Sequence, residues 1–406
     1  MTQCHDGTLL LVAFTCEPDL GSEYEIGWRW SIGAGKVFRS VIVFTRLASL
    51  RRIPGEPDTF RRWPARRLGN ILFVGIDLPF ADRLSGRTLM RTHYAVWQLL
   101  LFAFLKVSKL PAAIIHHVAF VAVWMSPVAA FVGRPFIWGP IGTNKPVPHW
   151  YGRARLSSWV RYLVTHWWPK VSPLGRRAQK NALRLLPINS HVHSLLSPAG
   201  KAKSLTAPAI RIPQALVVEH YVSLLSRKRR ILFVGRAIDV KLPLLANDVG
   251  RSILDADPSV EFWMIGEGLS RIIPRPYPER MRVLNFLPQS QVWEIMSGSM
   301  VMLFPSVEGS GFVVLEAMAL GLPIVCLEDT GPAAFVGFSG GIPCPSGPSY
   351  EHVHHQLKEA VLRLLSDKAL WEKLSTGARN RAREFTWEDL PKFLYNLYRD
   401  VILEAS

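Results

Sequence analysis

The stretch "SMVMLFPSVEGSGFVVLEAMALGLPIVCLE" (residues 299–328) contains two apolar runs separated by a loop and a helix-forming segment. The runs at 299–306 and 322–328 are continuous rather than alternating, which is typical of strands buried on both faces of a parallel sheet. "FVVLEAMAL" predicts a helix, and Gly321 and Pro323 end it. The stretch therefore predicts a strand–loop–helix–strand unit, the building block of α/β proteins.

The same pattern recurs along the whole chain. Apolar runs predict further strands at 8–14, 40–46, 70–76, 113–118, 135–140, 229–236, 260–268 and 282–287. Helical stretches between them give βαβ units, so each half is predicted to be a doubly wound, Rossmann-like domain. The second series starts after "SRKRR" (226–230). We therefore expect an amino-terminal domain at 1–222, a carboxyl-terminal domain at 223–385, and a final amphipathic helix at 386–406 that packs back toward the amino-terminal domain.

The composition indicates a globular protein. Of the 406 residues, 49% are hydrophobic and 19% are charged, which excludes a disordered chain. The four cysteines lie far apart and lack metal-ligand spacing, which argues against a disulfide framework and a zinc site and favours a reducing compartment. The apolar amino terminus has no basic segment and no cleavage site, so we expect a first strand there and not a signal peptide.

The charge is distributed unevenly. The net charge is +17, yet residues 1–218 carry 28 Lys or Arg against 9 Asp or Glu, while residues 219–406 carry 20 against 22. No acidic residue occurs between Asp82 and Glu219, a segment with 18 basic residues. Such a field attracts an anionic partner, which is a nucleic acid, an anionic membrane surface or a phosphorylated substrate.

Two segments of this basic half have the composition of a membrane-facing surface. The segment at 92–107 is apolar almost all round, and the segment at 151–170 mixes arginines with tryptophans such as Trp167 and Trp168. Interleaved basic and aromatic residues favour the headgroup region of a bilayer, although the same mixture also stacks on nucleic-acid bases. A buried helix explains the first segment equally well. We predict no transmembrane helix, because histidines and a proline interrupt the apolar run at 111–133.

The loop and the predicted helix of the opening stretch carry two carboxylates. Glu308 lies in the loop, and Glu316 lies in the predicted helix beside Leu315 and Ala317. A carboxylate among apolar neighbours loses hydration unless a partner replaces the water, and the hydroxyl groups of a sugar or a ribose are suitable donors. The amides of residues 309–312 lie at the predicted amino terminus of the helix, where an anion is favourable.

Other strand ends also carry residues suited to a ligand, because doubly wound domains bind ligands there. Gly235 and Arg236 end one predicted strand and Lys241 follows, a set that suits a diphosphate leaving group. Another strand ends with His116 and His117, one of which should project into a cleft, although a strand-end histidine is commonly a core residue. Small residues at strand ends let backbone amides approach a phosphate closely, and these are Gly21, Ser22 and Gly266.

Together these residues resemble glycosyltransferase family four, a family of retaining enzymes with the GT-B fold. The resemblance rests on Gly235–Arg236 with Lys241, on Glu308 and Glu316 followed by "ALGLPIV", and on "GSE" (21–23), "HHV" (116–118) and "PFIWGPIG" (135–142). It implies two Rossmann-like domains that face each other across a cleft. It also implies a nucleotide-sugar donor held by the second domain, an acceptor held by the first, and no metal or other cofactor.

The resemblance further implies roles for individual residues. Arg236 and Lys241 would stabilise the departing diphosphate. Glu308 would contact hydroxyls of the donor sugar, and Glu316 would contact the ribose. His117, in preference to His116, would support the sugar and the reaction. The other implied donor-binding residues are Gly21, Ser22, Gly235, Gly266, Gly309, Ser310, Gly311, Phe312 and Val313. Such enzymes are thought to work by front-face attack, with a donor phosphate oxygen assisting deprotonation of the acceptor, so no protein nucleophile is required.

Two departures from the family pattern bear on the activity and the acceptor. Leu242 follows Lys241 where relatives usually carry a glycine. Thr143, Asn144 and Lys145 stand where relatives with a similar first domain continue with glycine and an acid. Together with the acid-free segment, this reversed charge favours a phosphorylated or lipid-phosphate acceptor over a neutral metabolite.

We therefore predict a cytoplasmic hexosyltransferase, peripheral at the inner face of the cell membrane. It would add a sugar to a lipid-linked, polyprenyl diphosphate-bound glycan for a surface polysaccharide or exopolysaccharide. One alternative is a soluble family-four enzyme with a small acceptor. Another is a non-enzymatic basic protein that binds nucleic acid or membrane, but such a protein has no need of cations and carboxylates around one cleft, so we expect no nucleic-acid partner. A degenerate transferase that only binds a partner is a third.

Overall fold

The computed structural model describes residues 5–18, 22–78, 81, 89–152, 159–160, 162–219 and 226–405. Contacts within the chain divide it into two compact units. The first unit comprises Met1–Thr143, Val160–Ala209 and Trp387–Ser406, and the second comprises Asn144–Trp159 and Ile210–Thr386. The sequence predicts a boundary at 222/223, whereas the contacts change unit at 209/210 and place residues 144–159 with the second unit.

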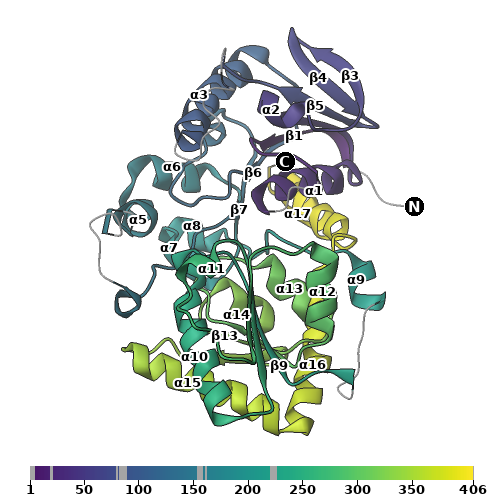
Figure 1. Ribbon diagram of the computed structural model, residues 1–406. Helices are drawn as coiled ribbons and strands as arrows, with labels where there is room; N and C mark the ends of the chain where they lie inside the picture. Colours follow the sequence, from purple (N-terminus) through teal and green to yellow (C-terminus); the bar gives the residue numbers. More distant parts are fainter. Residues whose placement is uncertain are drawn as a thin grey trace. The chain divides into compact units, whose positions relative to one another are not determined.

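The first unit is built on an eight-stranded sheet, counted over the described residues, in the order β3-β4-β5-β2-β1-β6-β7-β8. Its strands are β1 (His5–Ala13), β2 (Phe38–Thr45), β3 (Glu56–Phe60), β4 (Trp63–Leu68), β5 (Ile71–Gly75), β6 (Ile114–Ala119), β7 (Phe136–Ile141) and β8 (Arg184–Pro187). Along the part of the sheet with the order β5-β2-β1-β6-β7-β8, each strand runs parallel to its neighbour. Strands β3 and β4 extend the sheet as an antiparallel hairpin beside β5 (Figure 1). Strand order reverses at β1, which lies between β2 and β6 and so forms the switch point.

The first unit also contains helices. They are α1 (Ser22–Gly35), α2 (Leu47–Leu50), α3 (Met90–Ser108), α5 (Trp168–Val171), α6 (Pro173–Asn181), α7 (Ser190–Leu195), α8 (Pro198–Ala202) and α17 (Leu390–Ala405), with a 3-10 turn η2 (Val128–Phe131) and a π-helical turn η4 (Leu163–Trp167). The carboxyl-terminal helix α17 belongs to this unit and packs on α1, so closely that a Cβ on Gly33 would lie 3.0 Å from Leu390 Cδ2. The last helix of the chain thus completes the first unit.

The second unit contains a six-stranded parallel sheet, again over the described residues, in the order β11-β10-β9-β12-β13-β14. Its strands are β9 (Arg230–Val234), β10 (Glu261–Ile265), β11 (Met281–Leu284), β12 (Val301–Phe304), β13 (Ile324–Leu327) and β14 (Gly341–Cys344). In chain order this is the 3-2-1-4-5-6 arrangement of a Rossmann fold, whose switch point lies between β9 and β12.

Helices lie on both sides of this second sheet (Figure 1). They are α9 (Gln214–Glu219), α10 (Pro243–Ala256), α11 (Leu269–Ile272), α12 (Gln289–Ser297), α13 (Phe312–Ala319), α14 (Gly331–Val336), α15 (Tyr350–Ser366) and α16 (Lys368–Arg383), with 3-10 turns η3 (His149–Tyr151) and η6 (Asp239–Lys241). The side chains of Phe233, Val301 and Leu303 are fully buried in the core under α10 and α15. Burial on both faces explains why these strands have continuous apolar sequences.

All ten strands predicted from the sequence are confirmed, and the described residues form four others that were not predicted. The unpredicted strands are β3, β4, β8 and β14. The segment predicted to be apolar all round, 92–107, lies within α3. One face of this helix is buried, with residues such as Tyr94 and Trp97, and the other face exposes Leu99 and Val107. None of the described helices combines the length and the apolarity that a bilayer crossing requires.

Candidate functional site

The loops after β9 and β12 meet at the switch point of the second sheet. The backbone carbonyl of Val240 accepts hydrogen bonds from the amide of Val307 at 2.8 Å and from the hydroxyl of Ser306 at 3.0 Å. Because both bonds end on one carbonyl, the loop that carries Lys241 is fastened to the loop that carries Glu308. The parallel order of the strands thus brings together two residues that lie far apart in the sequence.

Lys241 and Glu308 form an ion pair at this junction. Lys241 Nζ lies 2.5 Å from Glu308 Oε2, and the two side chains are only 13% and 15% exposed. The same Nζ lies 4.7 Å from the centre of the Phe304 ring, so the cation also has an aromatic partner. The second carboxylate oxygen, Oε1, is buried and has no hydrogen-bond partner among the described residues. A buried oxygen of this kind requires a donor, and a ligand hydroxyl is a suitable one.

Glycines allow the backbone segments around this pair to approach closely. A Cβ on Gly266 would lie 2.0 Å from the carbonyl oxygen of Gly235, so no larger residue fits there without moving the chain. Gly331 packs in the same way on Gly309, since a Cβ on Gly331 would lie 2.1 Å from the Gly309 carbonyl carbon. The Gly331 amide donates to the carbonyl of Glu308 at 2.9 Å. The sequence indicated Gly235, Gly266 and Gly309 as site residues but not Gly331, which lies in α14.

Helix α13 begins directly after the Glu308 loop. Phe312 and Val313 form its first turn and are partly exposed, as is Ser310 before it. Gly311 precedes the helix, and a Cβ there would lie 3.2 Å from Glu308 Oε1. Amides at a helix amino terminus carry partial positive charge, so this turn offers donors to a phosphate beside the Lys241 ammonium.

The segment "TNK" (143–145) contributes to the same loop. Asn144 Oδ1 accepts a hydrogen bond from the Gly309 amide at 2.9 Å, and the Lys145 amide donates to the Val307 carbonyl at 2.9 Å. The Lys145 ammonium lies 4.0 Å from Asp329 Oδ2, and burial lowers its pKa. The sequence linked this segment to the acceptor, whereas Asn144 and Lys145 contact the loop of Glu308. No pattern in the sequence indicated that contact.

Glu316 and Arg236 lie at the edge of this arrangement. Glu316 Oε1 accepts a hydrogen bond from Gln289 Nε2 of α12 at 2.5 Å, and the residue is partly exposed. This partner explains how a carboxylate is accommodated next to apolar helix neighbours. Arg236 follows β9, is exposed, and has no ion-pair partner among the described residues. Its guanidinium is therefore available to an anion in solution.

Leu242 occupies a backbone conformation that favours glycine. It precedes α10 with φ 48° and ψ 49°, in the left-handed region, and its side chain is fully buried. A residue with a Cβ is strained there by roughly 1 kcal/mol. The geometry therefore gives a physical reason for the glycine that the family pattern has at this position, and packing of the leucine in the core offsets the strain here.

In the first unit, His116 and His117 lie in β6 beside the switch point, and both are buried. His116 has a partner on each ring nitrogen: Nε2 lies 2.8 Å from the Gly139 carbonyl and Nδ1 lies 2.8 Å from the Tyr398 hydroxyl. His117 Nε2 lies 2.7 Å from the Tyr94 hydroxyl, but its Nδ1 is buried without a partner among the described residues. Burial lowers the pKa of each histidine to about 3, so both imidazoles are neutral.

The predicted phosphate loop of the first unit is only partly described. Gly21 lies outside the described residues, and Ser22 is the first residue of α1. The next residue, Glu23, lies near Arg91 and the backbone of Val121, and burial raises the pKa of its carboxyl group to about 7. The sequence indicated Glu23 only as part of the "GSE" motif.

Metal ligation was predicted to be absent, and it stays a prediction. Within the described part of the chain, no three His, Cys, Asp or Glu side chains converge in a way that could hold an ion.

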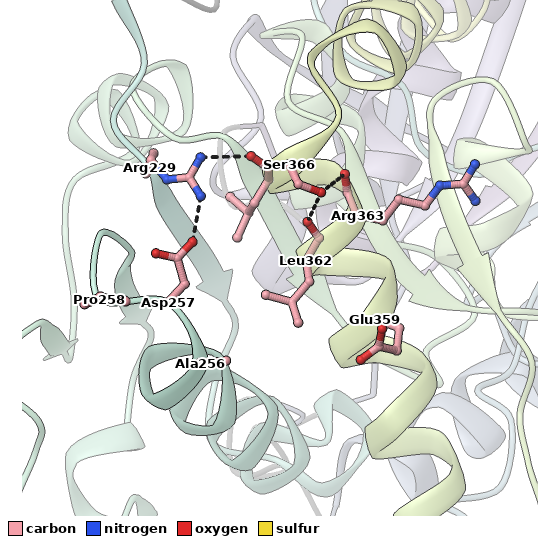
Figure 2. Close-up of a pocket in the computed structure, with 9 residues that line it drawn as sticks. Arg229, Ala256, Asp257, Pro258, Glu359, Leu362, Arg363 and Ser366 are labelled. Atoms are coloured by element: carbon pink, nitrogen blue, oxygen red, sulfur yellow. Dashed lines mark hydrogen bonds and ion pairs between the residues drawn. The ribbon is translucent and has the colours of Figure 1, made fainter.

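An open cavity of about 470 Å³ lies elsewhere in the second unit (Figure 2). Arg229, which precedes β9, donates to Asp257 Oδ2 at 2.7 Å and to the Leu365 carbonyl at 2.9 Å. Hydrogen bonds from Ser259 and Arg229 lower the pKa of Asp257 to about 2. Since the cavity lies at the amino-terminal end of β9, it is at the opposite edge of the sheet from Lys241, and Arg229 and Asp257 in it are already paired with each other.

Comparisons with known proteins identify the class of the second unit. Residues 228–367 match the family described as glycosyl transferases group 1. The chain is 29% identical to the O-antigen chain mannosyltransferase B of Escherichia coli over 29% of this chain and 30% of that protein. It is 26% identical to a D-inositol 3-phosphate glycosyltransferase of Streptomyces bingchenggensis over 42% of this chain and 40% of that protein. These matches span less than half the length of the curated relatives.

Solved structures extend the likeness to almost the whole chain. A trehalose 6-phosphate synthase from Burkholderia multivorans matches with a TM-score of 0.66 and 15% identity, covering 99% of this chain and 98% of that one. WaaG, a glycosyltransferase involved in lipopolysaccharide biosynthesis, matches with a TM-score of 0.59 and 15% identity over 96% and 99%. At such identities the likeness shows the fold, and the prediction of a GT-B fold with two Rossmann-like domains is confirmed. Residues 228–367 are a glycosyl transferases group 1 domain, which confirms the predicted class for that part of the chain.

Proposed function

We propose that the protein is a retaining, nucleotide-sugar-dependent glycosyltransferase. Its acceptor is a lipid-linked, polyprenyl diphosphate-bound glycan of a surface polysaccharide or exopolysaccharide, at the inner face of the cell membrane. The observation that carries the proposal is the pairing of Lys241 with Glu308 at the switch point of the second sheet, beside the amino terminus of α13. Sheets of this order bind nucleotides at that point.

The cations there suit the diphosphate of a nucleotide-sugar. Negative charge grows on the diphosphate as the glycosidic bond breaks, and preorganised donors stabilise that charge without reorganisation. Lys241 is held in place by Glu308 and by the Phe304 ring, whereas the Arg236 side chain is exposed and can be reached by an anion. The amides that begin α13 add neutral donors on the same side.

The carboxylates suit the hydroxyl groups of the donor. Glu308 uses Oε2 to hold Lys241 and keeps Oε1 buried without a partner among the described residues. A sugar hydroxyl that donates to Oε1 removes the cost of that buried acceptor. Glu316 is partly exposed and suits the ribose, with Gln289 orienting its carboxylate.

The first unit suits an anionic, membrane-bound acceptor. The acid-free segment between Asp82 and Glu219 carries 18 basic residues, of which 14 belong to this unit. The consecutive elements η4, α5 and α6 expose large apolar side chains, with Lys170, Arg176 and Arg177 exposed nearby; the exposed apolar residues are Leu163, Val164, Trp167, Trp168 and Leu174. Aromatic rings beside cations suit the boundary between headgroups and acyl chains of an anionic leaflet. The names of two similar proteins, which refer to O-antigen and to lipopolysaccharide, point to the same class of acceptor.

A small phosphorylated acceptor is the second candidate. The names of other similar proteins refer to D-inositol 3-phosphate, sucrose phosphate and trehalose 6-phosphate. The basic first unit would attract such an acceptor as well. The exposed aromatic side chains of η4 and α5 favour the lipid-linked acceptor, because a small soluble molecule does not require them.

A thermal-shift screen tests the donor half of the proposal. The full chain is heated with UDP, GDP, ADP and their sugars, and one series should raise the melting temperature by mass action. Glu308→Gln should reduce the shift caused by the sugar nucleotide more than the shift caused by the bare nucleotide. Glu359→Gln, at the distant cavity, is the matched control and should keep both shifts. No shift with any nucleotide contradicts the proposal.

Co-sedimentation with vesicles tests the acceptor half. Binding to vesicles that contain phosphatidylglycerol should exceed binding to phosphatidylcholine vesicles and should fall as salt rises. Replacing both Trp167 and Trp168 with Ser should weaken binding, while Phe338→Ser, an exposed aromatic of the second unit, should not. Absence of vesicle binding together with transfer to a sugar phosphate favours the small acceptor.

A further inference from the structure

We propose that Tyr94 is a positioning residue that fixes the tautomer of His117, so that the imidazole carries its proton on Nδ1 and presents an N–H donor to an oxygen of the bound sugar. The inference rests on the proposed function and on the role at the sugar that the family resemblance implies for His117. Its structural part, the location of one proton, is independent of that function and can be measured without any substrate.

The contact between the two side chains is buried and well packed. Tyr94 comes from α3 and His117 from β6, and their side chains are 0% and 1% exposed. The Tyr94 hydroxyl lies 2.7 Å from His117 Nε2. The rings of Phe14 and Phe120 lie 5.1 and 5.3 Å from the Tyr94 ring, centre to centre. These contacts leave the tyrosine little freedom to rotate, so its hydroxyl faces Nε2.

Counting hydrogen-bond donors decides which atom carries the proton. The Tyr94 oxygen accepts a hydrogen bond from the backbone amide of Phe120. If the tyrosine also donates its own proton to Nε2, then the hydroxyl and Nε2 both have hydrogen-bond partners. Only the Nδ1–H of His117 then lacks a partner among the described residues. If Nε2 donates to the tyrosine instead, then both the hydroxyl proton and the Nδ1 lone pair are left without partners among the described residues. Because each unsatisfied buried group costs about 1–3 kcal/mol, the first arrangement is favoured.

His117 is neutral, so one ring nitrogen is free of a proton. Burial and the neighbouring His116 lower its pKa to about 3, and Glu23, which lies near Tyr94, is the acidic group on that side. A neutral imidazole that donates from Nδ1 binds a hydroxyl or ring oxygen of a sugar without adding charge. This differs from Lys241 and Arg236, which suit phosphate.

His116 provides an internal comparison in the same strand. Its Nε2 faces the Gly139 carbonyl, which only accepts, so Nε2 must carry the proton and Nδ1 accepts from Tyr398. The two adjacent histidines are therefore expected to be opposite tautomers, each set by a tyrosine from a different helix. Tyr398, at 0% exposed, is a matched control for Tyr94.

Nitrogen NMR of the full chain with ¹⁵N-labelled histidine tests the inference directly. Signals of His117 and His116 are assigned by their loss in His117→Asn and His116→Asn, and long-range ¹H–¹⁵N correlations report which ring nitrogen is protonated. We expect Nδ1–H for His117 and Nε2–H for His116. Tyr94→Phe should convert His117 to Nε2–H or to a mixture, and Tyr398→Phe should leave it unchanged. A wild-type spectrum with the His117 proton on Nε2 overturns the inference.

Kinetics separate positioning from mere stability. Tyr94→Phe should lower kcat by about tenfold, the low end of the loss seen when a partner that orients a metal-ligating histidine is removed. Tyr398→Phe should have a similar melting temperature but near-normal kcat. Equal kcat losses in both variants argue against positioning. If no nucleotide binds in the thermal-shift screen, the proposed function fails, while the NMR result still decides the tautomer.

Discussion

Lys241 Nζ lies 2.5 Å from Glu308 Oε2, and the two residues follow neighbouring strands of one parallel sheet, β9 and β12. The pair is largely shielded from water and is fastened by hydrogen bonds to the Val240 carbonyl. Each residue therefore has a structural task, holding the other, as well as the proposed chemical one. Variants at this site should be interpreted with both tasks in mind.

Lys241→Met should destabilise the protein by about 1–3 kcal/mol, because it leaves a largely buried carboxylate without its cation. The double variant Lys241→Met/Glu308→Gln should recover part of this loss, since both charges are removed. Urea unfolding of the wild type, the two single variants and the double variant completes the cycle. Strict additivity of the two single effects would show that the pair is not coupled.

Lys241→Ala should lower turnover more than donor affinity, since charge on the diphosphate grows only as the bond breaks. The measurement is steady-state kinetics with the donor that the thermal-shift screen identifies, together with its dissociation constant. Unchanged turnover removes Lys241 from the mechanism. Lys368→Ala, an exposed lysine of α16, is the control.

Glu316→Ala should weaken nucleotide-sugar binding by about 10- to 100-fold, the range for losing a hydrogen bond to a charged group. Isothermal titration calorimetry gives the dissociation constants. Gln289→Ala removes the partner of Glu316 Oε1 but keeps the carboxylate, so its effect should be smaller. If Glu316→Ala unfolds the protein instead, then the carboxylate serves mainly the structure.

At position 242, a glycine variant should be more stable than an alanine variant, which is the reverse of the usual order in a helix-forming segment. Both Leu242→Ala and Leu242→Gly remove a buried side chain and should cost about 2–5 kcal/mol. The glycine variant should be the more stable of the two by about 1 kcal/mol, since the left-handed backbone strains alanine. At Ala246, in the interior of α10, glycine should instead be less stable than alanine by about 1 kcal/mol. Thermal unfolding of the four proteins, wild type included, gives the comparison.

Acid should destabilise the first unit through its buried histidines. The pKa of His117 is about 3 in the folded chain and near 6.5 when exposed. As pH falls below 6.5, the unfolded chain takes up a proton that the folded chain refuses, so the free energy of unfolding decreases. His117→Asn should reduce this pH dependence by about 1.4 kcal/mol per pH unit between pH 6 and 4. An unchanged slope from urea unfolding would contradict the burial of a neutral His117.

The sequence was most informative about the strands, because their apolar runs repeat along the chain. Strands buried on both faces must be apolar throughout, so runs such as 229–236 could be recognised without any partner strand. The hairpin of β3 and β4 escaped notice because its residues, among them Asp58 and Arg67, pair across an exposed face. Its charged, proline-containing sequence resembles a loop.

Parts of the site could be anticipated for a similar reason. Gly235 lies at the end of a predicted strand, Lys241 and Glu308 follow predicted strands, and parallel order brings the ends of such strands to one edge. The contact of Asn144 with Gly309 and that of Tyr94 with His117 depend on how distant segments pack. Neither spacing nor composition encodes such pairs, so they emerge only from the structure.

The chain passes from one unit to the other four times, after Thr143, Trp159, Ala209 and Thr386. A gene fragment cut at a single position therefore yields no complete unit: the second needs residues 144–159 in addition to 210–386, and the first needs 387–406. Exchange of acceptor specificity between related proteins by recombination thus requires several matched junctions rather than one. Point substitution within a unit is the easier route for such specificity to diverge.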